Sequence, residues 1–404
     1  MLTWEEKVFS VVMLFYTTQA VLPFFVVEDD PLSPRQTAPI DLAIKAALYS
    51  VAFCFIAIHW RSVIEGVRNI KWLVALVVLA VASTAWSQDP SFTFRTSVSL
   101  VATTAFGVYF GTRYTVPQQL RLLAWTCSLL VSLSFFFAIF LPKYGIRHDA
   151  QGAWQGVFIY KNWLAKAMVL AVPVFLFVRP KRFNSLRWLG VAASFALLFL
   201  SRSATGMVVC VAIIATLVLC RLVGARDAVT VPFLALGLIV VGLLLFQNLT
   251  VAAALQAVGR SPDLTGRTEL WSAVLLSIFR RPWLGYGFSE FWQGTHGEAA
   301  SVLRTIEWLP GSAHNGFLDV VLQLGALGLI TFGAGYLVFC RRALDLVSRV
   351  PGSVSAWLCT YLLFVLLYNL TESPLLMQHS IYWVLYTSTA VSLSPVSFRQ
   401  FCTE

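Results

Sequence analysis

The chain has 404 residues, of which 58% are hydrophobic and only 12% are charged, and its mean hydropathy is +0.76. A soluble domain carries roughly a quarter charged residues, so this composition excludes an ordinary soluble enzyme, a disordered chain and a disulfide-rich secreted domain. The net charge of +10 invites a nucleic-acid interpretation, but a chain this apolar belongs in a bilayer, and we expect no nucleic-acid partner. In a membrane protein, basic residues set the orientation and contact lipid headgroups.

Apolar stretches long enough to cross a bilayer recur along the whole chain. A transmembrane helix needs about 20 predominantly apolar residues. Such stretches fall at roughly 8–27, 40–59, 72–87, 96–113, 119–141, 160–179, 187–201, 203–222, 229–249, 315–340, 355–370 and 375–394. The prediction is an all-α polytopic membrane protein with about 12 transmembrane helices, in which the whole chain, 1–404, forms a single membrane-embedded domain.

Lysine and arginine are distributed unevenly between the two sets of short loops. The loops after even-numbered stretches hold most of them: Arg61, Arg68, Lys71, Arg113, Arg121, Arg179, Lys181, Arg182, Arg187, Arg221, Arg226, Arg341, Arg342 and Arg349. Because cytoplasmic loops carry the excess of Lys and Arg, both termini are predicted to be cytoplasmic. The segment 250–313 falls on the outer side as one long periplasmic loop, and long loops escape the charge rule.

This outer loop contains a predicted amphipathic helix. Residues 267–280 place five apolar side chains on one helical face: Leu270, Trp271, Val274, Leu275 and Ile278. The pattern is typical of a helix that lies in the plane of the membrane interface. Pro282 ends the helix, and the next apolar stretch begins just after His314. We therefore expect His314 at an outer helix N-terminus.

Four ionisable residues are expected to meet at the outer membrane face: Arg202, Arg260, Arg267 and His314. Taken alone, a histidine at a helix start is more often a cap than a catalyst, and a lone arginine more often contacts lipid headgroups or lies in a solvated turn. Their convergence favours a functional site, because ionisable groups are costly near hydrocarbon and guanidinium groups bind phosphate oxygens in bidentate fashion.

Other polar residues near this face have two interpretations each. Lys161, at the outer start of the sixth stretch, either reaches a phosphate or extends its ammonium to the interface. Glu372, in the last outer turn, either positions a sugar or pairs with an arginine. The outer loops contain no D-x-D or H-E-x-x-H motif, and the chain has no P-loop or Rossmann glycine pattern. We expect no metal site and no cofactor.

Several short motifs resemble the O-antigen ligase and polymerase superfamily. In chain order they are Ser201-Arg202-Ser203-x-x-Gly206, Gly266-Arg267-x-x-x-Trp271, Pro282-x-x-Gly285-x-Gly287, His314-Asn315-x-x-Leu318 and Gly325-x-x-Gly328. Two others are more similar to the exopolysaccharide-polymerase branch, of the succinoglycan type: Trp86-Ser87-x-Asp89-Pro90 and Gly152-x-Trp154-x-Gly156-x-Phe158-x-x-Lys161-Asn162. That branch often has a histidine before the Lys-Asn pair, whereas this chain has Tyr160.

The resemblance implies an inverting, metal-independent glycosyl transfer at the periplasmic face of the bacterial inner membrane. The implied donor is a glycan on undecaprenyl diphosphate, the acceptor is a glycan or a lipid-linked glycan, and membrane lipids surround both. The arginines would hold the diphosphate and stabilise the leaving group, and His314 would be the general base for the acceptor hydroxyl. We expect His314 and Arg267 to be catalytic. The residues expected to bind substrate are Arg202, Arg260, Lys161, Asn162, Asn315 and Glu372.

Two other functions fit the same chain. An O-antigen ligase would transfer the glycan to lipid A core instead of extending a polysaccharide. A flippase or other transporter of lipid-linked glycans would also have many spans and a basic cavity. Transporters usually hold their substrate near the membrane midplane. The polar residues of this sequence gather at one face, which favours the enzyme.

Overall fold

The structure is a computed structural model, and it describes residues 2–20, 26–27, 36–37, 39–147, 152–179, 184–223, 267–293, 297–306, 311–350 and 352–394. The regular secondary structure of these residues is helical, apart from two short antiparallel strands, β1 (Val26–Val27) and β2 (Gln36–Thr37). The predicted helical class is confirmed. The predicted span at 229–249 lies outside the described residues, as does Arg260.

The helices overlap the predicted apolar stretches wherever the structure describes them, although several bounds differ. Their bounds are α1 Trp4–Thr17, α2 Pro39–Ile58, α3 Trp60–Asn69, α4 Lys71–Ala82, η2 Ser83–Ala85, α5 Pro90–Arg113, α6 Val116–Phe140, α7 Pro142–Gly145, α8 Lys161–Phe177, α9 Asn184–Leu200, α10 Ala204–Val223, α13 Arg267–Arg280, α14 Gly297–Thr305, α15 Gly316–Arg349, α16 Ser353–Asn369 and α17 Ile381–Ser392. The amphipathic helix predicted at 267–280 is α13, whereas α3 and α14 were not predicted.

Several helices have the length or composition of membrane spans. In the described part of the chain, three are long and apolar enough to cross a bilayer by themselves: Pro39–Ile58, Val116–Phe140 and Gly316–Arg349. Four shorter helices are also apolar: Lys71–Ala85, Asn184–Leu200, Ala204–Val218 and Ser353–Asn369. The protein is therefore a helical membrane protein.

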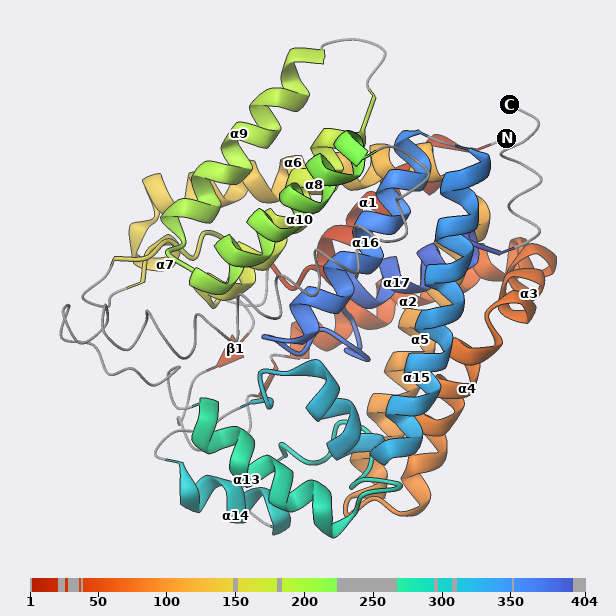
Figure 1. Cartoon of the computed structure of the whole chain (residues 1–404), viewed down its shortest axis with the longest axis vertical. Coiled ribbons are helices and arrows are strands. Elements are labelled where there is room, and N and C mark those ends of the chain that lie inside the picture. Colours follow the sequence, from red (N-terminus) through yellow and green to blue (C-terminus); the bar gives the residue numbers. More distant parts are fainter. Residues whose placement is uncertain are drawn as a thin grey trace.

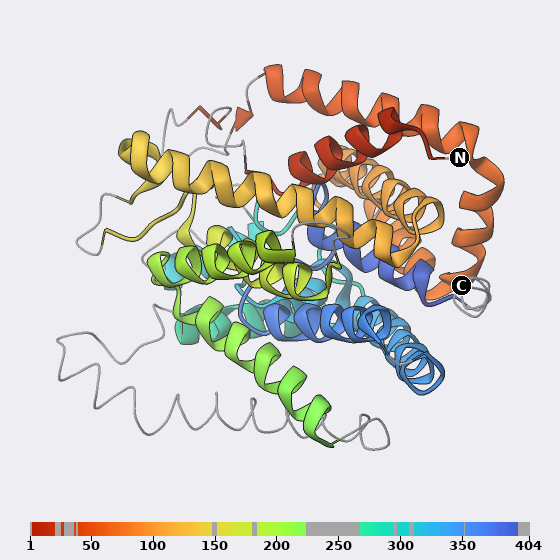
Figure 2. The same ribbon diagram turned by 90° about the horizontal axis from the view of Figure 1, so that it is seen from above.

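Two glycines let α5 and α17 approach each other closely. An ideal Cβ on Gly107 would lie 2.7 Å from Cβ of Thr387, and one on Gly111 would lie 2.9 Å from Cβ of Val391. The spacing G-x-x-x-G places both glycines on one face of α5, as in close helix pairs of other membrane proteins. Around this pair, α4 and α15 pack against each other and α1 packs along α6 (Figures 1 and 2).

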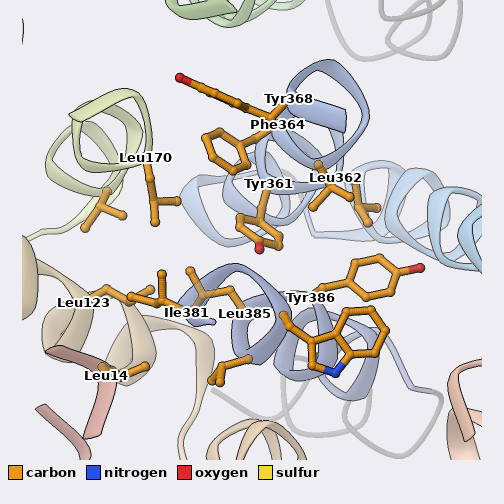
Figure 3. Close-up of a cluster of buried hydrophobic side chains, with 14 of the residues drawn as sticks. Leu14, Leu123, Leu170, Tyr361, Leu362, Phe364, Tyr368, Ile381, Leu385 and Tyr386 are labelled. Carbon is orange, nitrogen blue, oxygen red and sulfur yellow. The ribbon is translucent and has the colours of Figure 1, made fainter. Parts of the chain in front are cut away.

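The centre of the hydrophobic core lies between α16 and α17. Figure 3 shows Tyr361 and Phe364 of α16 beside Ile381 and Leu385 of α17, all of them buried. The hydroxyl of Tyr361 donates a hydrogen bond of 2.5 Å to the Tyr382 carbonyl, so this large polar side chain is satisfied inside the core. The Ser380 side chain caps α17 by accepting a hydrogen bond from Tyr382 N–H.

Several loops that the charge pattern assigned to one membrane side contact one another. At one end, Arg113 and His59 both contact the carboxylate of Glu6, with closest distances of 2.8 and 2.9 Å. At the end of α3, the Arg342 guanidinium donates a hydrogen bond to the carbonyl of Asn69. This arrangement joins three loops that the charge pattern assigned to one membrane side.

The long helix α15 is interrupted at Gly325, which has φ +66° and ψ −167°. An interruption leaves backbone N–H and C=O groups without helical partners. The segment that follows α13 supplies those partners. Four hydrogen bonds close the gap: Tyr286 N–H to Leu322 O (2.8 Å), Gly287 N–H to Gln323 O (3.0 Å), Ala326 N–H to Pro282 O (2.7 Å) and Leu327 N–H to Trp283 O (3.3 Å).

Candidate active site

Glu372 connects two of the predicted site residues, His314 and Asn162. Its Oε2 atom lies 3.6 Å from Nδ1 of His314, and its Oε1 atom accepts a 3.3 Å hydrogen bond from Nδ2 of Asn162. Glu372 is only 7% exposed, so the carboxylate is held between these partners in a poorly solvated position. Asn162 in turn accepts a 3.0 Å hydrogen bond from the Ser203 hydroxyl. The sequence did not predict the pairing of Glu372 with a histidine.

Three helices begin at this cluster. Asn162 is the second residue of α8, Ser203 precedes α10 and its hydroxyl accepts from Gly206 N–H, and the Asn315 side chain caps α15 by accepting from two backbone N–H groups. The Gly316 N–H also donates to the Glu372 carbonyl at 3.0 Å. Helix N-termini carry partial positive charge, so their convergence creates a position that favours an anion.

Arg202 and His314 share an unusual backbone conformation. Their φ angles are +50° and +49°, in the left-handed region that residues with a side chain rarely adopt. Each residue immediately precedes a residue whose side chain caps a helix, Ser203 and Asn315 respectively. The left-handed turn reverses the chain just before the helix starts. Strained backbone of this kind clusters at functional sites in proteins generally.

Three side chains hold the loop that carries His314 in place: Trp271, Trp292 and Asp319. The buried carboxylate of Asp319 accepts from Ala313 N–H at 3.1 Å and from the Trp292 indole at 2.7 Å. The indole of Trp271 donates to the Ala313 carbonyl at 2.8 Å. Sequence reasoning missed Asp319. The signal was present, because a lone acidic residue in the first turn of an apolar helix favours the helix N-terminus.

The motif that contains Lys161 and Asn162 supports the Arg202 turn. Trp154 N–H donates to the Leu200 carbonyl at 3.0 Å, two residues before Arg202. Lys161 is the first residue of α8 and is half-buried, and Arg202 is exposed at the start of α10. Lys161 and Arg202 thus lie beside the N-termini of α8 and α10, which the hydrogen bond between Ser203 and Asn162 links directly.

Two of the predicted arginines have no described side chain. Arg260 lies outside the described residues, and Arg267 is described as the first residue of α13 without its side chain. Arg267 lies one helical turn before Trp271, so the two share a face of α13. Since Trp271 contacts the residue before His314, α13 begins close to the His314 loop. On the predicted apolar face of α13, Leu270 and Val274 are fully buried within the protein, whereas Leu275 is 42% exposed.

The remaining outer histidine in the described chain, His379, belongs to a different cluster. Its Nδ1 atom lies 2.9 Å from the Tyr49 hydroxyl, and that hydroxyl also contacts Thr103 at 2.9 Å. Nearby, Lys45 forms an ion pair of 2.6 Å with the buried Asp41. These contacts join α2, α5 and the start of α17 and give the cluster a structural role.

The motif Trp86-Ser87-x-Asp89-Pro90 also has a structural role. The Trp86 indole donates to the Leu284 carbonyl at 3.0 Å, and the Ser83 hydroxyl accepts from Phe288 N–H at 2.9 Å. Asp89 caps α5 by accepting from Phe92 N–H. The motif therefore fixes the 282–288 segment, which closes the break in α15.

These features define the chain as a multi-pass helical membrane protein with a polar cluster at one end of its helix bundle. Residues 189–333 match the O-antigen ligase family, so this part of the chain is similar to that family. Over 359 aligned residues it is 23% identical to the exopolysaccharide production protein ExoQ of Rhizobium meliloti (strain 1021), an alignment that covers 77% of this chain and 80% of ExoQ. Both findings confirm the resemblance drawn from the motifs.

The family match divides the candidate site into two parts. The residues inside it are Arg202, Arg260, Arg267, His314 and Asn315. Lys161, Asn162 and Glu372 lie outside it. The contacts of Glu372 join the two parts across α8, α15 and the turn after α16.

Proposed function

We propose that this protein is an inverting, metal-independent glycosyltransferase of the exopolysaccharide-polymerase type. It would move a glycan from an undecaprenyl diphosphate donor to an acceptor sugar on a glycan or lipid-linked glycan. The observation that carries the proposal is the pairing of His314 with Glu372 where three helix N-termini meet, next to a chain segment that matches the O-antigen ligase family.

The reaction needs a base for the acceptor hydroxyl, and His314 is suited to that role. The hydroxyl oxygen attacks the anomeric carbon, the bond from that carbon to the diphosphate oxygen breaks, and the electron pair leaves with undecaprenyl diphosphate. The proton of the hydroxyl passes to His314. Because Nδ1 faces Glu372 at 3.6 Å, Nε2 is the atom that would accept the proton, and the carboxylate would stabilise the imidazolium that forms.

The diphosphate needs positive charge, since no metal takes part in the proposal. Arg202, Arg260 and Arg267 would bind it and stabilise the charge that develops on the leaving group. The N-termini of α8, α10 and α15 add partial positive charge at the same place. Lys161 at the start of α8 and Asn315 at the start of α15 would make further contacts with the substrate.

The proposal includes a topology. We infer a bacterial inner-membrane protein with about 12 spans, both termini in the cytoplasm and the long loop 250–313 in the periplasm, so that the site faces the periplasm. The contacts of Glu6 with His59 and Arg113 support this arrangement, because the charge pattern assigns all three residues to the cytoplasmic side. The whole chain, 1–404, then acts as a single membrane-embedded domain.

An O-antigen ligase is the second candidate, and the description of the matched family favours it. The similarity to an exopolysaccharide production protein over most of the chain favours the polymerase. The two reactions differ in the acceptor. A polymerase extends the glycan repeatedly, whereas a ligase adds one glycan chain to lipid A core.

A transfer assay with purified protein and a defined undecaprenyl diphosphate oligosaccharide tests the proposal. A ladder of repeats identifies a polymerase, and a single addition onto lipid A core identifies a ligase. We expect His314→Ala to lower kcat by about 10²–10⁴-fold and Arg267→Ala to lower it by about 10²–10³-fold. Normal product formation by both well-folded variants would refute the mechanism.

A matched control is available on the same helix as Arg267. Arg280 is the last residue of α13 and forms an ion pair with Glu298. Arg280→Ala removes an arginine from α13 at the end away from the His314 loop. We expect it to transfer glycan at the normal rate. A strong loss in Arg280→Ala would mean that the assay reports the general state of the loop and not the chemistry of Arg267.

A further inference from the structure

A groove runs between α4 and α5 at the edge of the helix bundle (Figure 1). It has a volume of about 450 Å³ and is lined by residues of both helices and of the end of α3. On α4, Val74, Val78 and Val81 follow at spacings of four and three residues, so they form one stripe along the helix. A matching stripe runs along α5 from Val101 to Val108. The short side chains of the two stripes leave the space between the helices unfilled.

The lining of this groove is suited to hydrocarbon. Among the described residues that line it, Thr104 of α5 is the one with a polar side chain. Its hydroxyl donates a 2.7 Å hydrogen bond to the Leu100 carbonyl and accepts a 2.8 Å hydrogen bond from the Trp383 indole. The hydroxyl is therefore already satisfied, and the groove would gain most from an apolar occupant.

One end of the groove lies at a helix with the features of the membrane interface. On α3, Trp60, Ile64 and Val67 are exposed at spacings of four and three residues, whereas Val63 and Gly66 are buried. A helix with an exposed apolar face beside charged residues lies in the plane of the interface. Val67 also lines the groove, so this end of the groove opens at the level of the lipid headgroups.

Basic residues surround the same end of the groove. Arg68 and Lys71 are exposed within two positions of the lining residue Ile70. From α15, the guanidinium of Arg342 donates a 3.2 Å hydrogen bond to the carbonyl of Asn69. Positive charge prevails here, which favours an anionic lipid headgroup. The charged residues of α3, of the start of α4 and of positions 341–349 in α15 are Arg61, Glu65, Arg68, Lys71, Arg341, Arg342, Asp345 and Arg349.

The length of the groove matches one lipid chain of a single leaflet. Along α4 its lining residues extend from Ile70 to Ala82, and at about 1.5 Å per residue this distance is roughly 18 Å. One leaflet contributes about half of a hydrocarbon core of about 30 Å, or roughly 15 Å. A lipid with its headgroup beside Ile70 would therefore fill the groove toward the middle of the bilayer.

We propose that the groove between α4 and α5 binds one acyl chain of an anionic phospholipid, whose headgroup contacts Arg68, Lys71 and Arg342. The predicted topology places this headgroup in the cytoplasmic leaflet, on the side opposite to the proposed donor site. The bound lipid fills the space that α3, α4 and α5 leave open and stabilises their packing. The inference goes beyond the proposed function and does not depend on glycosyl transfer.

Lipid titration of the purified full-length protein tests the inference, with binding followed by native mass spectrometry. The probes are phosphatidylglycerol and phosphatidylcholine with identical acyl chains. We expect phosphatidylglycerol to bind at least about tenfold more tightly and to raise the unfolding temperature by roughly 2–5 °C. Glycerol 3-phosphate carries the charge without the chain, so it should not displace the bound phosphatidylglycerol.

Two kinds of variant separate the headgroup contact from the chain contact. Lys71→Gln should weaken the binding of phosphatidylglycerol by roughly fivefold and leave that of phosphatidylcholine unchanged. Val78→Phe fills the groove and should weaken the binding of phosphatidylglycerol by at least about tenfold. Val78 is 59% exposed, so the larger side chain has room to fold. Val101→Phe, from the opposite wall and 41% exposed, replaces it if needed.

Each variant has a matched control. Arg121→Gln removes an exposed basic residue of α6 from the same predicted membrane side. Val98→Phe enlarges a side chain of α5 that is 50% exposed and is not among the residues that line the groove. We expect both controls to bind phosphatidylglycerol as tightly as the unmodified protein.

Three results would overturn the inference. The first is equal affinity for phosphatidylglycerol and phosphatidylcholine in the unmodified protein. The second is an unchanged affinity for phosphatidylglycerol in well-folded Lys71→Gln. The third is an unchanged affinity in the well-folded groove-filling variant, Val78→Phe or Val101→Phe. If that variant also converts a dimer into a monomer, the occupant of the groove is a second copy of this chain and not a lipid.

Discussion

Gly325 lies against the backbone of Trp283, so closely that a Cβ on the glycine would stand 2.1 Å from the Trp283 carbonyl oxygen. Here α15 is interrupted and the 282–287 segment supplies the hydrogen bonds that the helix lacks. The motifs Pro282-x-x-Gly285-x-Gly287 and Gly325-x-x-Gly328 therefore form one structural unit. The unit connects α13 to the helix that begins with the His314 loop.

Gly325→Ala should be strongly destabilising, because the new methyl group clashes with backbone and the φ of +66° is strained for alanine. We expect a loss of at least about 3 kcal/mol in the free energy of unfolding, measured by thermal unfolding in detergent. Gly333→Ala, on the same helix with no atom within 4 Å of its Cβ position, is the control. It should be neutral or slightly more stable. Equal stability of the two variants would contradict the close contact between Gly325 and the Trp283 backbone.

The contact between α5 and α17 gives a second prediction. Gly107→Ala places a methyl group 2.7 Å from Cβ of Thr387, and overpacking of this kind costs roughly 1–3 kcal/mol. In that background Thr387→Gly should restore stability, whereas Thr387→Ala should not, because alanine keeps the clashing Cβ. Thermal unfolding of the three variants measures this. Rescue by Thr387→Ala would show that the helices separate more easily than the packing indicates.

Asp319 should affect activity through the loop that holds His314. Asp319→Ala removes the acceptor for Ala313 N–H and the Trp292 indole. We expect kcat to fall by roughly 10-fold to 100-fold as His314 moves and stability to fall by about 1–3 kcal/mol. Trp292→Phe removes one of the two donors and should have a smaller effect on both quantities. An Asp319→Ala variant with normal kcat and lower stability would limit Asp319 to a structural role.

Glu6 should make stability depend on pH. It lies in the first turn of α1, ahead of the apolar stretch that begins at residue 8. Burial disfavours its charged form, but hydrogen bonds from Arg113 and His59 outweigh burial and lower the pKa of Glu6 below its ordinary value of 4.5. A lowered carboxyl pKa stabilises the fold above the unfolded-state value, and this stabilisation is lost as the pH falls through the folded-state value.

The Glu6→Gln variant measures this contribution. At pH 7 we expect the free energy of unfolding of Glu6→Gln to be about 1–3 kcal/mol lower than that of the unmodified protein. The difference should shrink as the pH falls below 4.5, where Glu6 begins to protonate. The measurement is thermal unfolding of both proteins at pH values from 7 to 3. A difference that is constant with pH would show that the charge of Glu6 is not what stabilises this end of the bundle.

The sequence predicted the helices well where hydrophobicity alone decides. The stretch 40–59 appears as Pro39–Ile58, and the amphipathic pattern at 267–280 appears as Arg267–Arg280. The break at Gly325 could not be predicted, because apolar residues continue through it and its cause is a contact with residues some 40 positions earlier. The G-x-x-x-G of α5 was readable from the sequence, but its partner helix was not.

The site was predictable in its residue types and only partly in its contacts. His314 lies at a helix start as expected, and Glu372 links it to Asn162 by contacting both side chains. The two sequence interpretations of Glu372 were a sugar contact or an arginine pair, and the pairing with His314 arises because α8, α15 and the turn after α16 meet.

The left-handed backbone at Arg202 and His314 makes the site a place where activity and stability oppose each other. Glycine would adopt those φ angles without strain, and relief of such strain is worth about 1–2 kcal/mol at each position. Glycine would also remove the guanidinium and the imidazole. Selection for heat resistance alone would therefore favour chains that have lost these two side chains, and only selection for their chemistry retains them.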